Sequence, residues 1–171
     1  MKTVRKIALV IALIAGITTI NAQISIGAGL GYNDFVAGPG VVVKGEIEIM
    51  EDIVASPGIS YFTGSKLYGQ KRNLFSVDVN GQYLIDIMLD ELKVYPLAGL
   101  NYSSYNTGDF YINDEADGII GRADKGNSLG LNVGAGGRWY FADQISVFAE
   151  LKYTVSDRSQ VVLVGGILYE L

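Results

Sequence analysis

Charged side chains recur at alternate positions in several segments of this chain, and their chemistry is the first guide to what it can do. Carboxylates can serve as general acids or bases, but the sequence contains no histidine, which removes the usual base of catalytic triads and dyads. We therefore expect a non-enzymatic protein with no catalytic residue. Because unpaired buried charges cost several kcal/mol each, roughly, we expect the charges to form a compensated network. Its predicted members are Lys44, Glu46, Glu48, Asp78, Lys93, Arg138, Glu150 and Lys152.

A second group of oxygen-bearing side chains lies in the segment 103–127. Positions one, three, five and twelve of a twelve-residue window are Asn113, Glu115, Asp117 and Asp124, and the sixth is a glycine. This spacing approximates a calcium loop, which however begins with Asp and ends with a bidentate Glu, and no flanking helices are expected here. We favour a solvated acidic loop tip and expect no metal and no cofactor.

The same segment contains more large apolar residues than a solvated loop needs. Loops on a rigid scaffold commonly carry binding, so we predict that the segment 103–127 contacts a protein partner. The candidate contact residues are Tyr105, Phe110, Tyr111, Ile112, Ile119 and Ile120.

The stretch 128–153 shows which elements position the charges. Its residues alternate between an apolar face that ends in aromatics and a face of glycine, asparagine and charge, with one interruption at 141–144. A period of two over this length predicts two long strands joined by a hairpin. Two structures fit this pattern: a soluble hairpin over a core, or a strand pair with lipid outside and a polar lumen inside.

The rest of the chain favours the second structure. The same alternation predicts eight strands, near 24–32, 41–49, 53–62, 75–85, 92–102, 128–140, 145–153 and 161–171. Longer links alternate with tight turns, as in an eight-stranded antiparallel up-and-down transmembrane β-barrel. A soluble barrel would instead place large apolar residues inside. Pro57 predicts a local kink in the third strand, because proline removes a donor from the hydrogen-bond ladder.

Aromatic residues on the predicted outer face fall into two groups, one at each end of the strands. Such belts are natural at two membrane interfaces. Tyr32, Tyr61, Phe75, Tyr102 and Tyr153 fall at the long-link end, and Tyr83, Trp139 and Tyr169 at the tight-turn end.

The first 22 residues have the order of a secretory signal peptide, with a basic start, an apolar run and a small residue at Ala22. A transmembrane anchor is the alternative, but the uncharged run is short. We expect the domain to comprise 23–171 after cleavage, when the net charge of −5 becomes −8. This acidic balance predicts no nucleic-acid partner, because phosphate contacts need clustered Lys and Arg.

Two segments resemble the later strands of the small outer-membrane barrels related to the outer-membrane protein A barrel domain. They are 95–102, YPLAGLNY, and 131–141, LNVGAGGRWYF, closed by AELKY at 149–153. The resemblance implies an eight-stranded barrel in the bacterial outer membrane, contact with outer-membrane lipid, and insertion by the barrel assembly machinery. The chain ends at Leu171, so we do not expect a peptidoglycan-tethering role.

From these observations we expect a structural or interaction role, such as envelope integrity, adhesion or an accessory subunit of an envelope complex, with contacts through extracellular loops. A narrow gated channel for small solutes or ions is the alternative. An eight-stranded barrel has an interior only just wide enough for side chains, so the predicted charge network favours a plug over a conduction path. Pairing of Arg138 and Lys152 with Glu46, Glu48 and Glu150 would seal the lumen.

Overall fold

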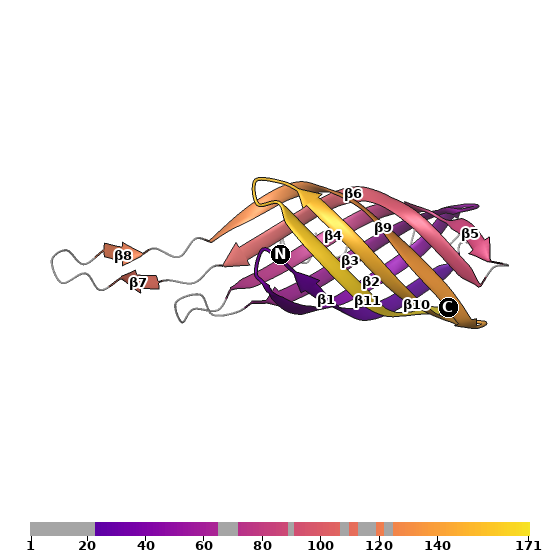
Figure 1. Ribbon diagram of the computed structural model, residues 1–171. Helices are drawn as coiled ribbons and strands as arrows, with labels where there is room; N and C mark the ends of the chain where they lie inside the picture. The colour runs from indigo at the N-terminus through magenta and orange to yellow at the C-terminus, as the bar shows by residue number, and fades with distance from the viewer. Residues whose placement is uncertain (1–22, 65–71, 89–90, 107–109, 113–118, 122–124) are drawn as a thin grey trace, which may run out of the picture.

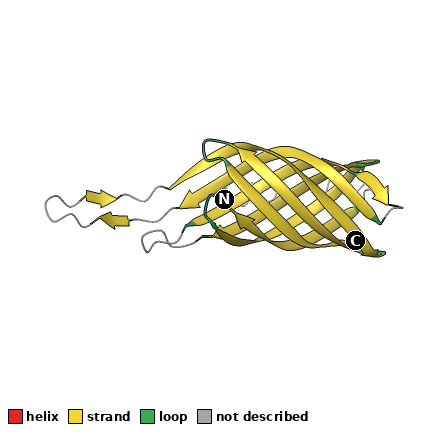
Figure 2. Ribbon diagram, viewed as in Figure 1, coloured by secondary structure: helices red, strands yellow, loops and turns green. Residues whose placement is uncertain are grey.

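The computed structural model describes residues 23–64, 72–88, 91–106, 110–112, 119–121 and 125–171. Strands make up nearly all of this part of the chain (Figure 2). None of the described residues forms a helix long and apolar enough to cross a membrane. The signal peptide expected over 1–22 and the calcium candidates Asn113, Glu115, Asp117 and Asp124 lie outside the described residues.

The strands close into one antiparallel barrel (Figure 1). Sequence neighbours pair around the wall, β4 pairs with β6, and β1 pairs with β11, which closes the ring. The wall strands are β1 Ile24–Asn33, β2 Gly38–Met50, β3 Ile53–Thr63, β4 Asn73–Tyr83, β5 Ile85–Met88, β6 Leu92–Asn106, β9 Lys125–Ala142, β10 Ile145–Val155 and β11 Gln160–Glu170.

The short strand β5 continues β4 and does not add a ninth position to the wall. Gln82 pairs with Leu97, and Ile85 pairs with Val94, so the register with β6 is unchanged across the gap. The backbone amide of Leu84 donates instead to the carbonyl of Asp52, at 2.7 Å. The predicted eight-stranded up-and-down barrel is therefore confirmed.

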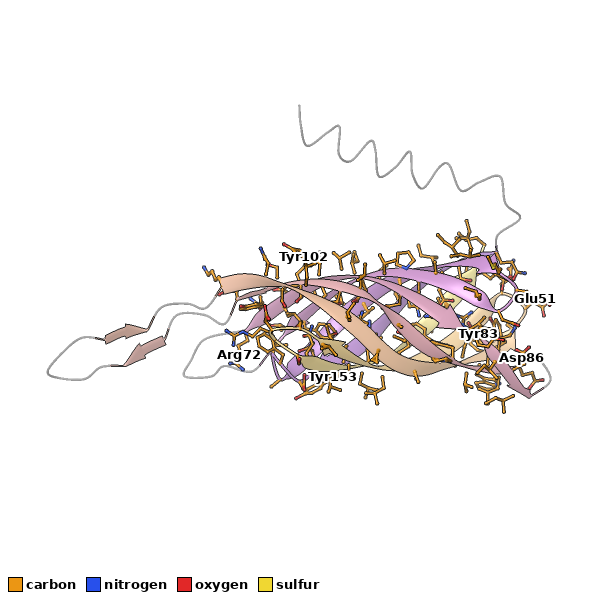
Figure 3. The ribbon with its side chains drawn as sticks, turned by 90° about the horizontal axis from the view of Figure 1, so that it is seen from above. Glu51, Arg72, Tyr83, Asp86, Tyr102 and Tyr153 are labelled. Atoms are coloured by element: carbon orange, nitrogen blue, oxygen red, sulfur yellow. The ribbon has the colours of Figure 1, made fainter. Side chains whose placement is uncertain are left out.

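Residues alternate between the two faces of the wall, apart from three shifts of register near the short-turn end. The outer face is apolar and exposed, with Leu30 at 71% and Leu129 at 78%, whereas polar and charged side chains of the inner face are buried. In Figure 3 Tyr102 and Tyr153 lie near the end of the barrel beyond which β7 and β8 are drawn, and Tyr83 lies near the opposite end. Both predicted aromatic groups are exposed on the outer face. We call the two ends the long-loop end and the short-turn end.

The connections at the short-turn end are tight, as expected. Two residues, Glu51 and Asp52, separate β2 from β3, and two others, Asp143 and Gln144, separate β9 from β10. The kink predicted at Pro57 causes no shift of register, because Lys44 pairs with Gly58 on one side of it and Ile47 with Ala55 on the other.

The interior is less uniformly polar than the sequence pattern predicted. At the long-loop end a cluster of buried apolar side chains includes Val36, Phe62 and Leu74, with Phe35 and Tyr105 packed against it. A second cluster contains Val54, Leu84, Tyr95 and Leu97. We name the part of the first cluster at the long-loop end the apolar cap, defined by Val36, Phe62 and Leu74 with Phe35 and Tyr105. The other members, Val42, Phe148, Val162, Val164 and Leu168, continue the cluster along the lumen, where Phe148 and Val164 pair across the strands with Arg138 and Glu150.

The cap exists because the first connection folds inward. β1 and β2 extend further than predicted and leave only Asp34–Ala37 between them. The amide of Val36 donates to the Asn33 side chain at 3.2 Å, and Ala37 adopts a left-handed φ of 52°. This turn places Val36 in the barrel interior with no exposed surface.

The segment 103–127, predicted as irregular, is instead partly a β-ribbon. β6 and β9 continue to pair out to Asn106 and Lys125, because nothing in the sequence interrupts their antiparallel ladder. Beyond them β7 Phe110–Ile112 pairs with β8 Ile119–Gly121 in a separate two-stranded sheet (Figure 1). We call the paired ends Ser103–Asn106 and Lys125–Ser128, together with β7 and β8, the ribbon.

Candidate functional site

The inner faces of β2, β9 and β10 bring four of the predicted charges together in the barrel. Lys44 and Glu46 are alternate residues of β2, Arg138 comes from β9 and Glu150 from β10, and all four are at least 95% buried. We call this group the central charge cluster. Because each strand alternates and the barrel closes, residues 92 or more positions apart in sequence meet across the lumen.

Each carboxylate of the central charge cluster is ion-paired. Lys44 pairs with Glu150 and also lies 2.9 Å from Glu46, and Arg138 pairs with the other oxygen of Glu46. The cluster has two cations and two anions, so its net charge is zero. Arg138 also donates to the hydroxyl of Tyr140 at 2.9 Å, which fixes the guanidinium toward the short-turn end.

Neutral polar groups complete the hydrogen bonding of Glu150. Its Oε1 accepts from the Tyr95 hydroxyl at 2.9 Å and from the Gln82 amide at 3.2 Å, besides the Lys44 ammonium. The Lys44 ammonium also lies 4.5 Å from the centre of the Phe148 ring, which is a cation–π distance. The cluster is thus packed as well as paired.

A second buried network surrounds Asp78. Lys152 lies 3.3 Å from one carboxylate oxygen, and the amides of Asn101 and Asn132 donate to the other at 2.7 and 2.8 Å. Asn132 in turn accepts from the hydroxyl of Thr154 at 2.7 Å. This Asp78 cluster is also neutral, with one cation and one anion.

The structure separates the other predicted network residues from these clusters. Lys93 pairs with Asp86 at 3.2 Å, and both side chains are partly exposed at the short-turn end. Glu48 is half-buried in β2 and lines a cavity there. Lys152, expected beside Glu150 and the β2 carboxylates, makes its ion pair with Asp78 instead.

That cavity, of about 240 Å³, forms a polar vestibule at the short-turn end. Glu46 and Arg138 of the central charge cluster form part of its lining, together with Lys93 and Tyr140. Figure 3 shows Glu51 and Asp86, two further lining residues, at this end of the barrel. Among the described residues, the Nε atom of Arg138 is one of the buried side-chain atoms without a hydrogen-bond partner.

The side chains of this interior fill and close the lumen. Two charged layers, each neutral and hydrogen-bonded, lie below the apolar cap in a barrel whose interior is only just wide enough for side chains. Breaking a buried pair leaves an uncompensated charge, so the layers resist opening. Among the described residues no group of three or more acidic side chains has the geometry to hold a metal ion.

Several members of the networks were not singled out from the sequence. Gln82, Asn101 and Asn132 were placed on the inner face by alternation alone, and Tyr95 likewise. Which strands face one another across the lumen depends on strand tilt and stagger, and alternation contains no information on either. The signal that could have found them is the coincidence of inward amides and carboxylates on neighbouring strands.

Of the predicted partner-contact residues, the structure describes the side chain of Tyr105. Its ring packs edge-on against Phe35, with ring centres 5.6 Å apart, and the guanidinium of Arg158 lies 5.5 Å above it. Tyr105 therefore belongs to the apolar cap. Phe110, Tyr111 and Ile112 lie in β7, and Ile119 and Ile120 in β8, where each pairs across the two-stranded sheet.

No family model matches the chain, and no curated protein matches it in sequence. Solved structures match the fold. The N-terminal β-barrel domain of Pseudomonas aeruginosa OprF is 18% identical with a TM-score of 0.60, covering 87% of this chain and 97% of that one. A major outer-membrane protein of Thermus thermophilus is 14% identical with a TM-score of 0.69, covering 89% and 100%.

A third match is the attachment invasion locus protein Ail of Yersinia pestis, solved in complex with the heparin analogue sucrose octasulfate. It is 14% identical with a TM-score of 0.61, covering 89% of this chain and 100% of Ail. At these sequence identities the matches show similarity of fold alone. The chain therefore has the fold of small eight-stranded bacterial outer-membrane β-barrels, as its sequence predicted.

Proposed function

We propose that this chain, with the fold of an eight-stranded outer-membrane barrel, is a sealed, non-enzymatic envelope protein with a structural or interaction role. It lies in the outer membrane with its long-loop end outside and is inserted there by the barrel assembly machinery. Contacts with other molecules are made by its outer surfaces, above all by the ribbon.

The observation that carries this proposal is the filled interior. The central charge cluster and the Asp78 cluster are both neutral and buried, and the apolar cap closes the long-loop end. These layers leave little room for a substrate within the described part of the barrel, and the sequence has no histidine to act as a base. The surfaces that remain available for contact with other molecules are the outside of the barrel and its ends.

Two further observations support an interaction role. β6 and β9 extend their pairing to Asn106 and Lys125, beyond the last pairs of the neighbouring β10, so the ribbon is carried on a rigid base, as binding loops commonly are. Among proteins of similar fold, Ail is an attachment protein solved with a heparin analogue. Adhesion or a subunit role in an envelope complex fits both.

The test is to replace 107–124 by an Asn-Gly turn and compare the two proteins in the native outer membrane. The turn joins Asn106 to Lys125, which already pair, so the barrel wall is untouched. After chemical cross-linking and mild-detergent extraction, we expect a stoichiometric companion with the full-length protein and none with the shortened one.

A matched control shortens another connection at the same end, by replacing 65–71 between β3 and β4. We expect this variant to keep the companion. A lone monomer from all three proteins would contradict the interaction role and leave a stand-alone structural barrel. A companion retained after removal of 107–124 would place the contact on another surface.

A narrow gated channel is the second candidate, and the polar vestibule of about 240 Å³ is the observation that favours it. Its inner end is closed by the Glu46–Arg138 pair, so opening would require that pair to part. Unlike the sealed barrel, a gated channel should pass current in a reconstituted bilayer.

A further inference from the structure

Two depressions follow one another along the outer wall at the long-loop end, and the upper one reaches the edge of the apolar cap at Tyr105. The lower one, of about 510 Å³, is lined by apolar residues of β4, β6 and β9, including Val77, Leu100 and Leu131. The upper one, of about 340 Å³, continues along the same three strands. Each volume lies within the roughly 300–1,000 Å³ of small-ligand clefts.

The outward residues of these three strands change from apolar to polar within one cross-strand pair of one another, since Phe75 of β4 still faces Ser104 of β6. The sequence along each strand, read from the lower depression to the upper, is Val79, Val77, Phe75, Asn73 on β4, Leu100, Tyr102, Ser104, Asn106 on β6, and Leu131, Leu129, Asn127, Lys125 on β9. Cross-strand pairs hold them in register, since Val77 faces Tyr102 and Tyr102 faces Leu129.

The change of polarity coincides with the aromatic belt at the long-loop end. Tyr61 and Phe75 line the upper depression and Tyr102 the lower one. Because aromatic belts mark the headgroup level of a bilayer, the lower depression lies among acyl chains and the upper one among headgroups. Exposed leucines such as Leu129, at 78%, can be covered there by lipid.

Among the described residues that line the upper depression, the charged side chain is that of Lys125. Lys125 is exposed and lines the upper depression. The other described cations of this end are directed to the cap, since Arg72 donates to the carbonyl of Phe35 and Arg158 lies above the ring of Tyr105. Beside Lys125, the upper depression offers the amides of Asn73 and Asn127 and the hydroxyl of Ser104.

We propose that these two depressions together are a specific site for a phosphate-bearing glycolipid of the outer leaflet. An acyl chain lies in the lower depression, the phosphate lies at Lys125, and the amides and Ser104 hydrogen-bond sugar hydroxyls. A third depression on β1 to β4, of about 300 Å³, shares Val77 and Val79 with the lower one, so a second acyl chain can lie on the other side of the same valines. This proposal depends on the membrane orientation given under the proposed function.

Native mass spectrometry of the full-length barrel in non-ionic detergent tests this with a diphosphorylated lipid A and the same lipid with its phosphates removed. We expect one equivalent of the phosphorylated lipid to be retained. Lys125→Gln should weaken its binding by about tenfold, as for one lost charge-assisted hydrogen bond. Lys93→Gln removes the same charge at the opposite, short-turn end of the barrel and should leave binding unchanged.

A second pair of variants tests the acyl-chain depression. Val77→Phe should fill it and reduce binding, whereas Val161→Phe should not. The two valines are matched, because each is 38% exposed and each pairs across the strand with a belt tyrosine, Tyr102 or Tyr153. Heat-dependent gel migration checks that every variant is a folded barrel.

Equal binding of the two lipids, or equal binding by wild type, Lys125→Gln and Val77→Phe, would overturn the site. A dimer that Val77→Phe dissociates would overturn it too, by assigning this face to a second copy of the chain. Each of these results leaves the proposal of a sealed barrel standing if the protein still folds and passes no current. Failure of the proposed function would appear instead as current through the folded wild-type protein.

Discussion

Paired charges inside the barrel work at the scale of single residues. Glu46 is 2% exposed and Arg138 is 4% exposed. Because Lys44 is shared between Glu46 and Glu150, the central charge cluster needs Arg138 for its charge to be balanced. Removing one partner of a buried pair typically costs about 3–5 kcal/mol, whereas replacing both with neutral groups of similar size can be nearly neutral. The pair is therefore a test of how the interior is stabilised.

We predict that Arg138→Met lowers the free energy of unfolding by about 3–5 kcal/mol, because Glu46 loses its guanidinium partner. The double variant Glu46→Gln with Arg138→Met should recover most of this loss, since Lys44 and Glu150 still form a neutral pair. Urea unfolding in detergent micelles measures the cycle. Additive losses in the double variant would show that the two side chains are not coupled.

Two adjacent glycines of β9 differ in what lies next to them. A Cβ on Gly136 would lie 2.6 Å from the ring of Tyr95, whereas one on Gly137 would meet nothing closer than 3.8 Å. Gly136→Ala should therefore displace Tyr95, weaken its hydrogen bond to Glu150, and cost about 1–3 kcal/mol. Gly137→Ala, one residue away on the outer face, should change stability by less than about 0.5 kcal/mol.

The same unfolding measurement compares the two alanine variants directly. Equal stabilities for Gly136→Ala and Gly137→Ala would mean that the Tyr95 ring is not held against the β9 backbone. A selective loss in Gly136→Ala would confirm that glycine is required at that inward position by the close approach of an aromatic ring.

At the scale of elements, the first turn and the ribbon differ in what they contribute. The turn Asp34–Ala37 buries Val36 completely in the apolar cap, so it is part of the barrel core. The ribbon extends from strands already paired to the wall along their whole length. Changes in the turn should affect stability, and changes in the ribbon should affect contacts.

We predict that Val36→Ala destabilises the barrel by about 1–3 kcal/mol, from lost apolar burial. Replacing 107–124 with an Asn-Gly turn should leave stability within about 0.5 kcal/mol, because such a turn suits a two-residue hairpin. Urea midpoints and heat-dependent gel migration measure both. A ribbon-shortened protein that fails to fold would contradict the separation of the two roles.

Alternation along the chain predicted most of this structure at the level of elements. It placed Lys44, Glu46, Arg138 and Glu150 inside and the belt residues outside, because side chains of a strand point to opposite faces in turn. It did not predict the inward fold of Val36 or the length of β6 and β9. Both depend on backbone pairing and turn geometry, which a two-residue period does not encode.

The partners within the lumen could not be predicted for a related reason. Lys152 was expected beside Glu150, its neighbour on the same face of β10, but pairs with Asp78 of β4 across the barrel. Such pairs depend on the stagger of the whole closed sheet. A single strand specifies which residues enter the lumen, and the closed barrel specifies which of them meet.

At the scale of the whole molecule, layers follow one another along the barrel axis. The apolar cap closes the long-loop end, the Asp78 cluster and the central charge cluster fill the interior, and the polar vestibule opens at the short-turn end. The outer wall is apolar between two aromatic belts. We expect a molecule built in this way to span a membrane without connecting its two sides.

The conductance of the purified wild-type barrel in a planar lipid bilayer tests this central claim most directly. With insertion verified by protease protection, we predict no resolved opening steps at moderate voltage, and none in the Glu46→Gln, Arg138→Met double variant, because the cap still closes the other end. Reproducible opening steps in the wild type would contradict the sealed interior and identify the vestibule as the mouth of a channel.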